Sequence, residues 1–173
     1  FATAKAIWEQ LKSEADDPAD VMDHPARYAL VELVNVHDPG LEFEAIHRVV
    51  FDVDADDLFR AAAEYYGRVG TPCAVEWCDD YVAAQGAAAA AGAAHAVPFV
   101  AAGRYGLLKI EKPSLTLEVA TLQNFLDDYL QNRPASRIDY IHGEEAVTRL
   151  GGQRGNLGFY LPSISKHDLF RTI

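Results

Sequence analysis

The stretch HPARYALVELVNVHDPGLEFEAIHRVVFD, residues 24–52, carries the strongest strand pattern of the chain and decides the expected fold. From Ala26 to Val36 almost every residue is apolar or β-branched, and Glu32 is the one charged residue after Arg27. Strands that are apolar on both alternating faces are typical of sheet centres that are covered on both sides. This run therefore predicts a central strand of an α/β domain.

A turn and a return strand are expected directly after this run. The segment 38–40 is Asp-Pro-Gly, which has the composition of a turn. The return strand is expected over residues 43–53, with Glu42 and Glu44 on one side of the chain and His47 on the other. Because few residues separate the two strands, we expect them to pair antiparallel.

Helix and strand patterns alternate along the rest of the chain, without an internal repeat. Apolar residues spaced three and four apart predict helices, and short runs bounded by turn residues predict strands. Four of the expected helices span residues 4–11, 54–67, 144–150 and 165–172. A fifth helix is led by Asp79 and includes the tract 87–94, and a sixth is capped by Thr116 and stopped by Pro134. The expected strands are 72–77, 95–100, 104–111, 137–141 and 157–161. This order predicts one α/β (or α+β) domain over residues 1–173, with a mixed sheet covered by helices.

The Ala-rich tract 87–94 has two interpretations. Alanine has the highest helix propensity of all residues, which favours a helix here. Gly86 and Gly92 interrupt the tract, which instead favours a flexible, low-complexity insertion. We expect the helix.

Composition and charge exclude several classes of protein. The chain has 173 residues, half of them hydrophobic, and a net charge of -11. This charge argues against a nucleic-acid partner, since such partners require clustered Lys and Arg. No apolar stretch approaches the ~18 residues of a membrane span, so no membrane association is expected. Cys73 and Cys78 are five residues apart and expected on opposite faces of a strand, so we expect no disulfide and a cytoplasmic protein.

Several segments resemble a family of bacterial and archaeal proteins catalogued as domain of unknown function 1015. The resemblance is carried by HPARYALVELVNVHD and LEFEAIHRVVF, and also by ATAKAIWE, LGFYLPSI and KHDLFRTI, so it spans nearly the whole chain. Members of this family usually carry an Asp-Gly-Asn/His-His motif just before the part that matches Phe1–Trp8, and a basic segment after the part that matches Ile173. The sequence holds neither, so the resemblance implies a piece of a longer protein. The upstream motif is similar to that of the ParB/sulfiredoxin superfamily, which includes nucleotide-hydrolysing and kinase members.

Polar residues follow three of the expected strands, where α/β sheets often bind ligands. These residues are Asn35, His37 and Asp38 after the first strand, Asp79 and Asp80 after another, and His142 and Glu144 after a third. If the three strands were parallel, these side chains would converge. The simpler interpretation is that they are surface turns, in which such residues are common.

A second candidate cluster lies on the return strand. Glu42, Glu44 and His47 are candidate catalytic residues, because carboxylates and an imidazole can act as general base and proton shuttle. Arg48 is a candidate phosphate ligand, together with the ligand-binding candidates Asn35, His37 and Asp38. The alternative is a solvated strand face with Glu–Arg pairing.

A metal site at this cluster is not expected. It would have to be built from His37, Asp38, His47 and Glu42, whose spacing matches no known ligand motif. The sequence identifies no other cofactor and does not define the oligomeric state.

Two function classes follow from these patterns. In the first, the chain is part of an enzyme acting on a small phosphorylated or nucleotide ligand, with the upstream His motif of the resembled family as its reactive group. In the second, it is a non-catalytic binding or regulatory module with a protein partner. Convergence of Glu42, Glu44, His47 and Arg48 in one cleft would favour the enzyme.

Overall fold

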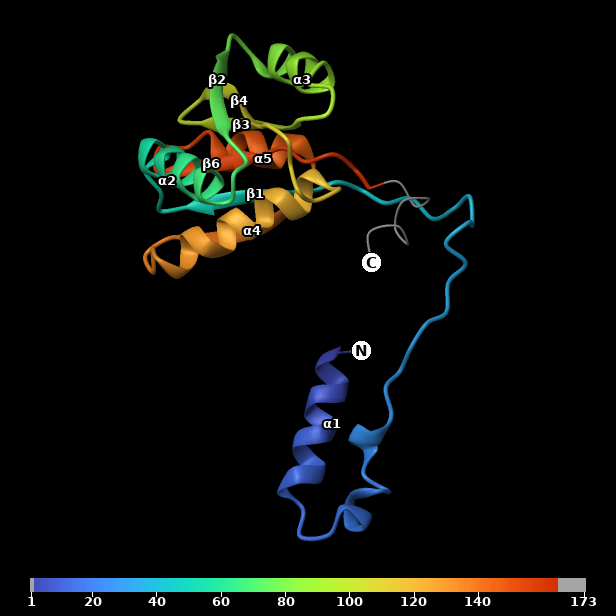
Figure 1. The fold of residues 1–173 in the computed structure, drawn as a ribbon. Coiled ribbons are helices and arrows are strands. Elements are labelled where there is room, and N and C mark those ends of the chain that lie inside the picture. The colour runs from blue at the N-terminus through green and yellow to red at the C-terminus, as the bar shows by residue number, and fades with distance from the viewer. Residues whose placement is uncertain (1, 165–173) are drawn as a thin grey trace. The chain divides into compact units, whose positions relative to one another are not determined.

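The computed structural model describes residues 2–164 and shows two compact units, Phe1–Asp38 and Pro39–Ile173 (Figure 1). The helix expected at 165–172 lies outside the described residues. The expectation that residues 1–173 form one domain stays a prediction.

The second unit is built on a six-stranded sheet in the order β2-β4-β3-β6-β1-β5. The strands are β1 (Ile46–Phe51), β2 (Cys73–Cys78), β3 (His95–Ala101), β4 (Arg104–Ile110), β5 (Arg137–His142) and β6 (Asn156–Phe159). The α/β class, with helices covering a sheet, is confirmed. The sheet is not mixed, however, because all five pairings among the described strands are antiparallel.

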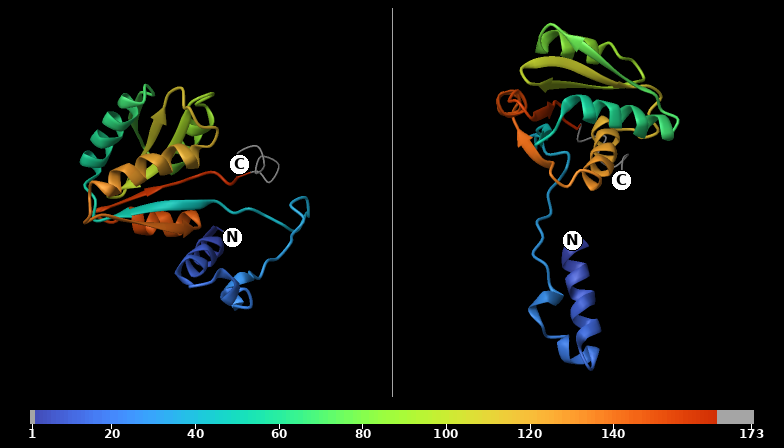
Figure 2. Two further views of the ribbon diagram at one scale, coloured as in Figure 1. Left: turned by 60° about the horizontal axis from the view of Figure 1, so that its bottom comes forward. Right: turned by 90° about the vertical axis from the view of Figure 1, so that its left-hand side faces the viewer.

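Among the described residues, four helices cover this sheet, two on each face (Figure 2). They are α2 (Ala55–Arg68), α3 (Tyr81–Ala89), α4 (Glu118–Gln131) and α5 (Glu144–Gly151). Neighbouring residues of one strand point to opposite faces. Accordingly Val50 packs in the core formed with α2 and α4, whereas Val49 packs in a smaller core that contains Val147 of α5. The fold is therefore a three-layer arrangement of helices, sheet and helices.

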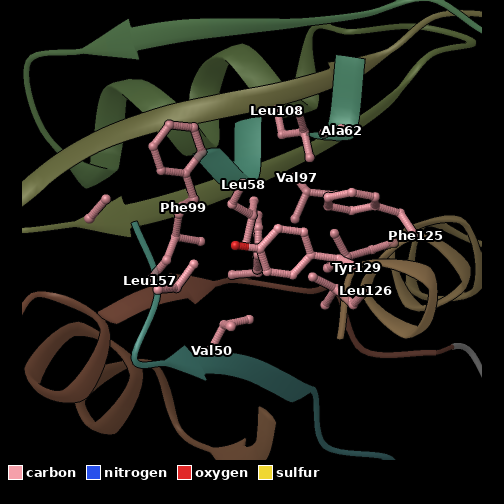
Figure 3. Close-up of a cluster of buried hydrophobic side chains, with 14 of the residues drawn as sticks. Val50, Leu58, Ala62, Val97, Phe99, Leu108, Phe125, Leu126, Tyr129 and Leu157 are labelled. Carbon is pink, nitrogen blue, oxygen red and sulfur yellow. The ribbon is translucent and has the colours of Figure 1, made fainter. Parts of the chain in front are cut away.

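The larger core lies between the sheet and the pair α2 and α4 (Figure 3). Phe99 at its centre is fully buried, and its ring lies 4.7 Å from that of Phe59 and 5.2 Å from that of Trp77. Phe125 and Leu126 of α4 close the other end of this core. Burial of such side chains contributes about 1.5–3 kcal/mol each.

Caps and turns formed by neighbouring residues were mostly predicted correctly from the sequence. Asp54 caps α2 as expected, since its side chain accepts a hydrogen bond from the Asp57 backbone N–H at 2.9 Å. Asp80 caps α3 in the same way. The expected hairpin is confirmed between β3 and β4, where Ala102 and Gly103 both have positive φ, as a two-residue turn of type I′ requires.

Two helix boundaries differ from expectation. Helix α3 ends at Ala89, so only the first part of the Ala-rich tract is helical. Helix α4 begins after Leu117 without a side-chain cap, so the capping role expected for Thr116 is wrong. The helix ends at Gln131, three residues before Pro134.

The first unit contains helix α1 (Ala2–Glu14), which confirms the first expected helix, and two short 3-10 helices, η1 (Pro18–Val21) and η2 (Pro25–Arg27). The imidazole of His24 caps η2 by accepting from the Ala26 N–H at 3.1 Å. No described side chain of residues 2–38 is buried.

The strand expected from Ala26 to Val36 is wrong. Residues 28–35 are extended but form no strand, and Leu30 and Leu33 are 104% and 99% exposed. The return strand is shorter than expected, and β1 pairs with β5 and β6 instead of with residues 26–36. The spacing of apolar residues shows which side chains a strand could bury. A strand also needs a neighbouring strand for its backbone hydrogen bonds, and none pairs with this segment among the described residues.

Candidate functional site

A pocket of about 460 Å³ lies on the face of the sheet that α3 and α5 cover. This volume is within the ~300–1,000 Å³ typical of small-molecule sites. Its lining residues are Ala45, Tyr81, Gln85, Ala88, Ala89, Ala96, Pro98, Glu118, Glu144, Tyr160, Leu161, Pro162 and Ser163. We call it the α3–α5 pocket.

Small side chains make room for this pocket. Ala88 and Ala89 end α3, and Ala45 and Ala96 line the pocket from the ends of β1 and β3. A larger side chain at any of these positions would fill part of the α3–α5 pocket. The Ala-rich tract was the sequence signal for this site, but its composition indicates helix propensity and does not reveal what the helix faces.

The polar groups of the pocket converge on Glu144. The Gln85 amide donates to the Tyr81 hydroxyl at 2.8 Å and lies 3.5 Å from the Glu144 carboxylate. Burial raises the pKa of the Tyr81 hydroxyl, and a hydrogen bond to Glu144 raises it further. Tyr81 therefore stays protonated at neutral pH, with the Glu144 carboxylate nearby.

A second tyrosine forms the inner wall. Burial raises the pKa of Tyr160 to about 12, and its hydroxyl bonds Thr148 Oγ1 at 2.7 Å. The rings of Tyr81 and Tyr160 lie 4.3 Å apart. Tyr160 is only 3% exposed, so the aromatic surface on which a flat ring could stack belongs mainly to the half-buried Tyr81.

The charge of the α3–α5 pocket is negative. Glu118 and Glu144 line it, and none of its described lining residues is Lys, Arg or His. Carboxylates accept hydrogen bonds and attract cations, whereas they repel phosphate. The pocket therefore suits amine, amide and hydroxyl donors of a ligand.

His47 lies directly behind this pocket. It is 3% exposed, its ring meets that of Tyr160 edge-on at 6.0 Å, and its Nδ1 accepts a hydrogen bond from the Leu161 N–H at 3.0 Å. Burial lowers the pKa of His47 below its ordinary 6.5; the Glu144 carboxylate opposes this shift, and the charges of Arg48 and His142 add to it. The imidazole is therefore neutral, with its proton on Nε2.

This depressed pKa predicts a loss of stability in mild acid. Below pH 6.5 the unfolded chain protonates His47 before the folded chain does, so the contribution of this group to stability is complete above 6.5 and falls as the pH drops toward the folded-state pKa. Urea unfolding at pH 7.5 and pH 5.5 measures the difference. His47→Asn keeps an acceptor for Leu161, so we expect a smaller difference between the two pH values. An unchanged difference in this variant would contradict the assignment.

Arg48 points to the opposite face. Its Nε donates to Gln123 Oε1 of α4 at 2.8 Å, its Nη1 donates to the Ile46 carbonyl at 2.6 Å, and its guanidinium lies 4.4 Å from the Tyr140 ring centre. It also lines a separate pocket of about 120 Å³, together with Glu44. Because neighbouring strand residues alternate, His47 and Arg48 do not line one pocket.

The two predicted catalytic carboxylates are solvent-exposed. Glu42 and Glu44 precede β1 in a segment without strand structure, so they are not held on a strand face as expected. Glu44 lies 3.5 Å from His142 Nδ1. The four residues Glu42, Glu44, His47 and Arg48 therefore do not converge in one cleft, and their roles stay predictions.

The expected convergence of strand ends takes a different form. Strand β2, which precedes Asp79, and strand β5, which ends at His142, lie at opposite edges of the sheet. It is the helices following them, α3 and α5, that bring Gln85 and Glu144 together.

Asn35, His37 and Asp38 lie in the first unit. The Asn35 side chain accepts from the His37 N–H at 3.0 Å, and the Asp38 N–H donates to the Asn35 carbonyl at 2.9 Å. These bonds form a local turn. Its expected proximity to the residues of the second unit stays a prediction.

Two features are absent from residues 2–164. No group of three or more His, Cys, Asp or Glu side chains in this range is arranged to hold a metal ion. Within the same residues, no helix has the length and apolar character needed to cross a membrane.

The fold and the pocket together define an α/β protein with an antiparallel sheet and a pocket lined by carboxylates and tyrosines. A family model described as protein of unknown function (DUF1015) matches residues 1–129, so the chain belongs to this family. No curated protein and no solved structure matches the chain significantly. Glu144 and Tyr160 lie beyond the matched residues.

Proposed function

We propose that this chain is part of an enzyme acting on a small nucleotide-like or phosphorylated ligand, and that the α3–α5 pocket holds the uncharged part of that ligand. The observation that carries the proposal is the convergence of Gln85, Tyr81 and Glu144 beside the Tyr160 ring. A nucleoside fits this chemistry, because its base can stack on tyrosine and its amino and hydroxyl groups can donate to carboxylates.

The negative lining decides how such a ligand would lie. A phosphate inside the pocket would meet Glu118 and Glu144 without a cation among the described lining residues. The nucleoside part therefore enters and any phosphate stays outside. The reactive group would be the His motif that the resemblance implies, while Glu118 and Glu144 are the carboxylates that line the pocket.

Glu144→Gln is expected to weaken adenosine binding about tenfold, since a hydrogen bond to a charged group contributes roughly 1.5–3 kcal/mol. Isothermal titration of the 173-residue chain with adenosine measures this change. Glu145→Gln is the matched control, because Glu145 is exposed on the same helix and does not line the pocket. Equal affinity in all three proteins, or no binding of adenosine to any of them, would contradict the proposal.

Adenosine and AMP form a matched pair for the phosphate. Similar affinities would place the phosphate in solvent, as the pocket geometry favours. Tighter binding of AMP would indicate a phosphate contact, for which Arg48 is the candidate because Pro162 lines both the α3–α5 pocket and the 120 Å³ pocket of Arg48. Arg48→Ala is a poor test of this contact, since it also removes the bonds to Gln123 and Ile46.

The alternative function, a binding module with a protein partner, is favoured by a different part of the chain. Residues 28–34 expose four large apolar side chains to solvent at 70% or more, namely those of Tyr28, Leu30, Val31 and Leu33. Exposed apolar surface of this kind marks interaction sites in many proteins.

A further inference from the structure

Residues 28–36, YALVELVNV, form a strand-like segment that lacks a partner among the described residues; we call it the apolar segment. Tyr28, Leu30 and Val34 fall on one side of an extended chain, and Val31 and Leu33 fall on the other. Each of these side chains is exposed. Such a segment can bury both of its faces only inside a layered structure.

The sheet of the second unit offers a complementary surface at β2. This strand pairs only with β4 among the described residues, so its outer backbone groups form an open edge. Natural edge strands are usually protected by Lys, Pro or charged side chains. The β2 sequence CAVEWC has no Lys and no Pro, and Glu76 is its one charge.

The opposite edge is better protected. Strand β5 carries three polar or charged side chains, Arg137, Asp139 and His142. The Asp139 carboxylate also accepts a hydrogen bond from the Tyr140 N–H at 2.8 Å, which occupies a backbone donor of this edge. Of the two edges, β2 is therefore the one open to a further strand.

Helices lie next to the β2 edge on both faces of the sheet. Helices α2 and α3 both contact β2. Trp77 of β2 itself is an apolar side chain that is 43% exposed. A strand added here would therefore meet an exposed apolar side chain of β2.

We propose that the apolar segment of one copy of this chain adds to the β2 edge of a second copy, and that the second copy returns the same contact. Backbone hydrogen bonds would extend the sheet by one strand, which is the recognition mode of strand addition. The exchange is reciprocal, so the assembly closes as a two-fold dimer.

The surface that the apolar segment could bury is of the size that a stable dimer requires. The apolar segment has a mass of roughly 1 kDa, and an extended chain exposes about 1.45 Å² per dalton, or about 1,450 Å² for the segment. Two exchanged segments carry about 2,900 Å² before the surface that they cover is counted, whereas stable interfaces bury about 1,200–2,000 Å² and obligate ones 2,000–5,000 Å². The exchange also explains how a first unit without buried side chains becomes ordered, since chains below about 40 residues rarely fold alone.

Sedimentation equilibrium of the 173-residue chain tests the proposal. We expect a molar mass of twice 19.0 kDa for the native sequence and of 19.0 kDa for the double variant Leu30→Asp, Leu33→Asp, which places a charge on each face of the apolar segment. Both positions are exposed, so the second unit should stay folded by circular dichroism. Ile7→Asp on α1 is the control, because Ile7 is exposed and lies outside the segment.

A cross-link identifies the surface that the segment contacts. Cys73 and Cys78 are free thiols on β2, so single cysteines at Val31 or Leu33 should form a disulfide between copies under mild oxidation. This dimer band should disappear when Cys73 and Cys78 are both replaced by Ser. A native chain that is monomeric, a double variant that remains dimeric, or cross-links that do not depend on these thiols would each overturn the proposal. A monomer whose amides 28–36 are protected from hydrogen exchange would also overturn it, because the segment would then pair within its own chain.

Discussion

Phe99→Ala is expected to lower the free energy of unfolding by about 3–5 kcal/mol, the range measured when a buried Phe is truncated. Phe99 is fully buried on β3, and its ring contacts both Phe59 of α2 and Trp77 of β2. Removing the ring leaves a cavity at the point where helix, edge strand and central strand meet. This loss is a large fraction of the stability of an ordinary domain, because total stabilities are only about 5–15 kcal/mol.

Guanidinium unfolding followed by circular dichroism measures this loss. Val82→Ala is the control, since Val82 is 73% exposed on α3 and its truncation should change stability by less than about 0.5 kcal/mol. If Phe99→Ala and Val82→Ala had equal effects, the larger core would not be packed as described.

Gly151→Ala is expected to cost about 1–3 kcal/mol, because it overpacks the contact between α5 and β6. A Cβ atom at this position would lie 2.5 Å from the Gly158 nitrogen and 2.6 Å from its Cα. These are backbone atoms, which cannot rotate away as a side chain can. Helix α5 must therefore move away from the sheet, and Glu144 at its first turn would move with it.

The matched control for this prediction is Gly67→Ala in α2, where a new Cβ meets no atom within 4 Å. That substitution should be neutral or stabilise by up to about 1 kcal/mol, through the higher helix propensity of alanine. Thermal unfolding of both variants separates steric overlap from the general effect of replacing glycine. An equal response at the two positions would contradict the close approach of α5 and β6.

Elements set by neighbouring residues were predictable from the sequence. The cap at Asp54 and the positive-φ turn at Ala102-Gly103 depend on atoms only a few positions apart. The strand expected at 26–36 failed because its formation depends on a partner strand, which local periodicity does not specify. The apolar pattern was recognised correctly, but its pairing was not.

The candidate site was likewise predictable only where it depends on neighbouring residues. That His47 and Arg48 face opposite sides follows from strand alternation alone and was predictable. The α3–α5 pocket was not, because Tyr81, Glu144 and Tyr160 come from distant parts of the chain and meet only when α3 and α5 pack on one face of the sheet. The acidic character of the pocket is a property of this packing.

The order of strands in the sheet has a consequence for synthesis on the ribosome. Strands β3 and β4 are joined by a two-residue turn and can pair as soon as they emerge. Strand β1 instead pairs with β5 and β6, and the first of these partners, β5, begins at Arg137. Phe51 and Arg137 are 86 positions apart (137 − 51), which at roughly 5–20 residues per second corresponds to a delay of about 4–17 s. During that delay the nascent chain carries Val49, Val50 and Phe51 without their strand partners, and this apolar stretch is then available to chaperones.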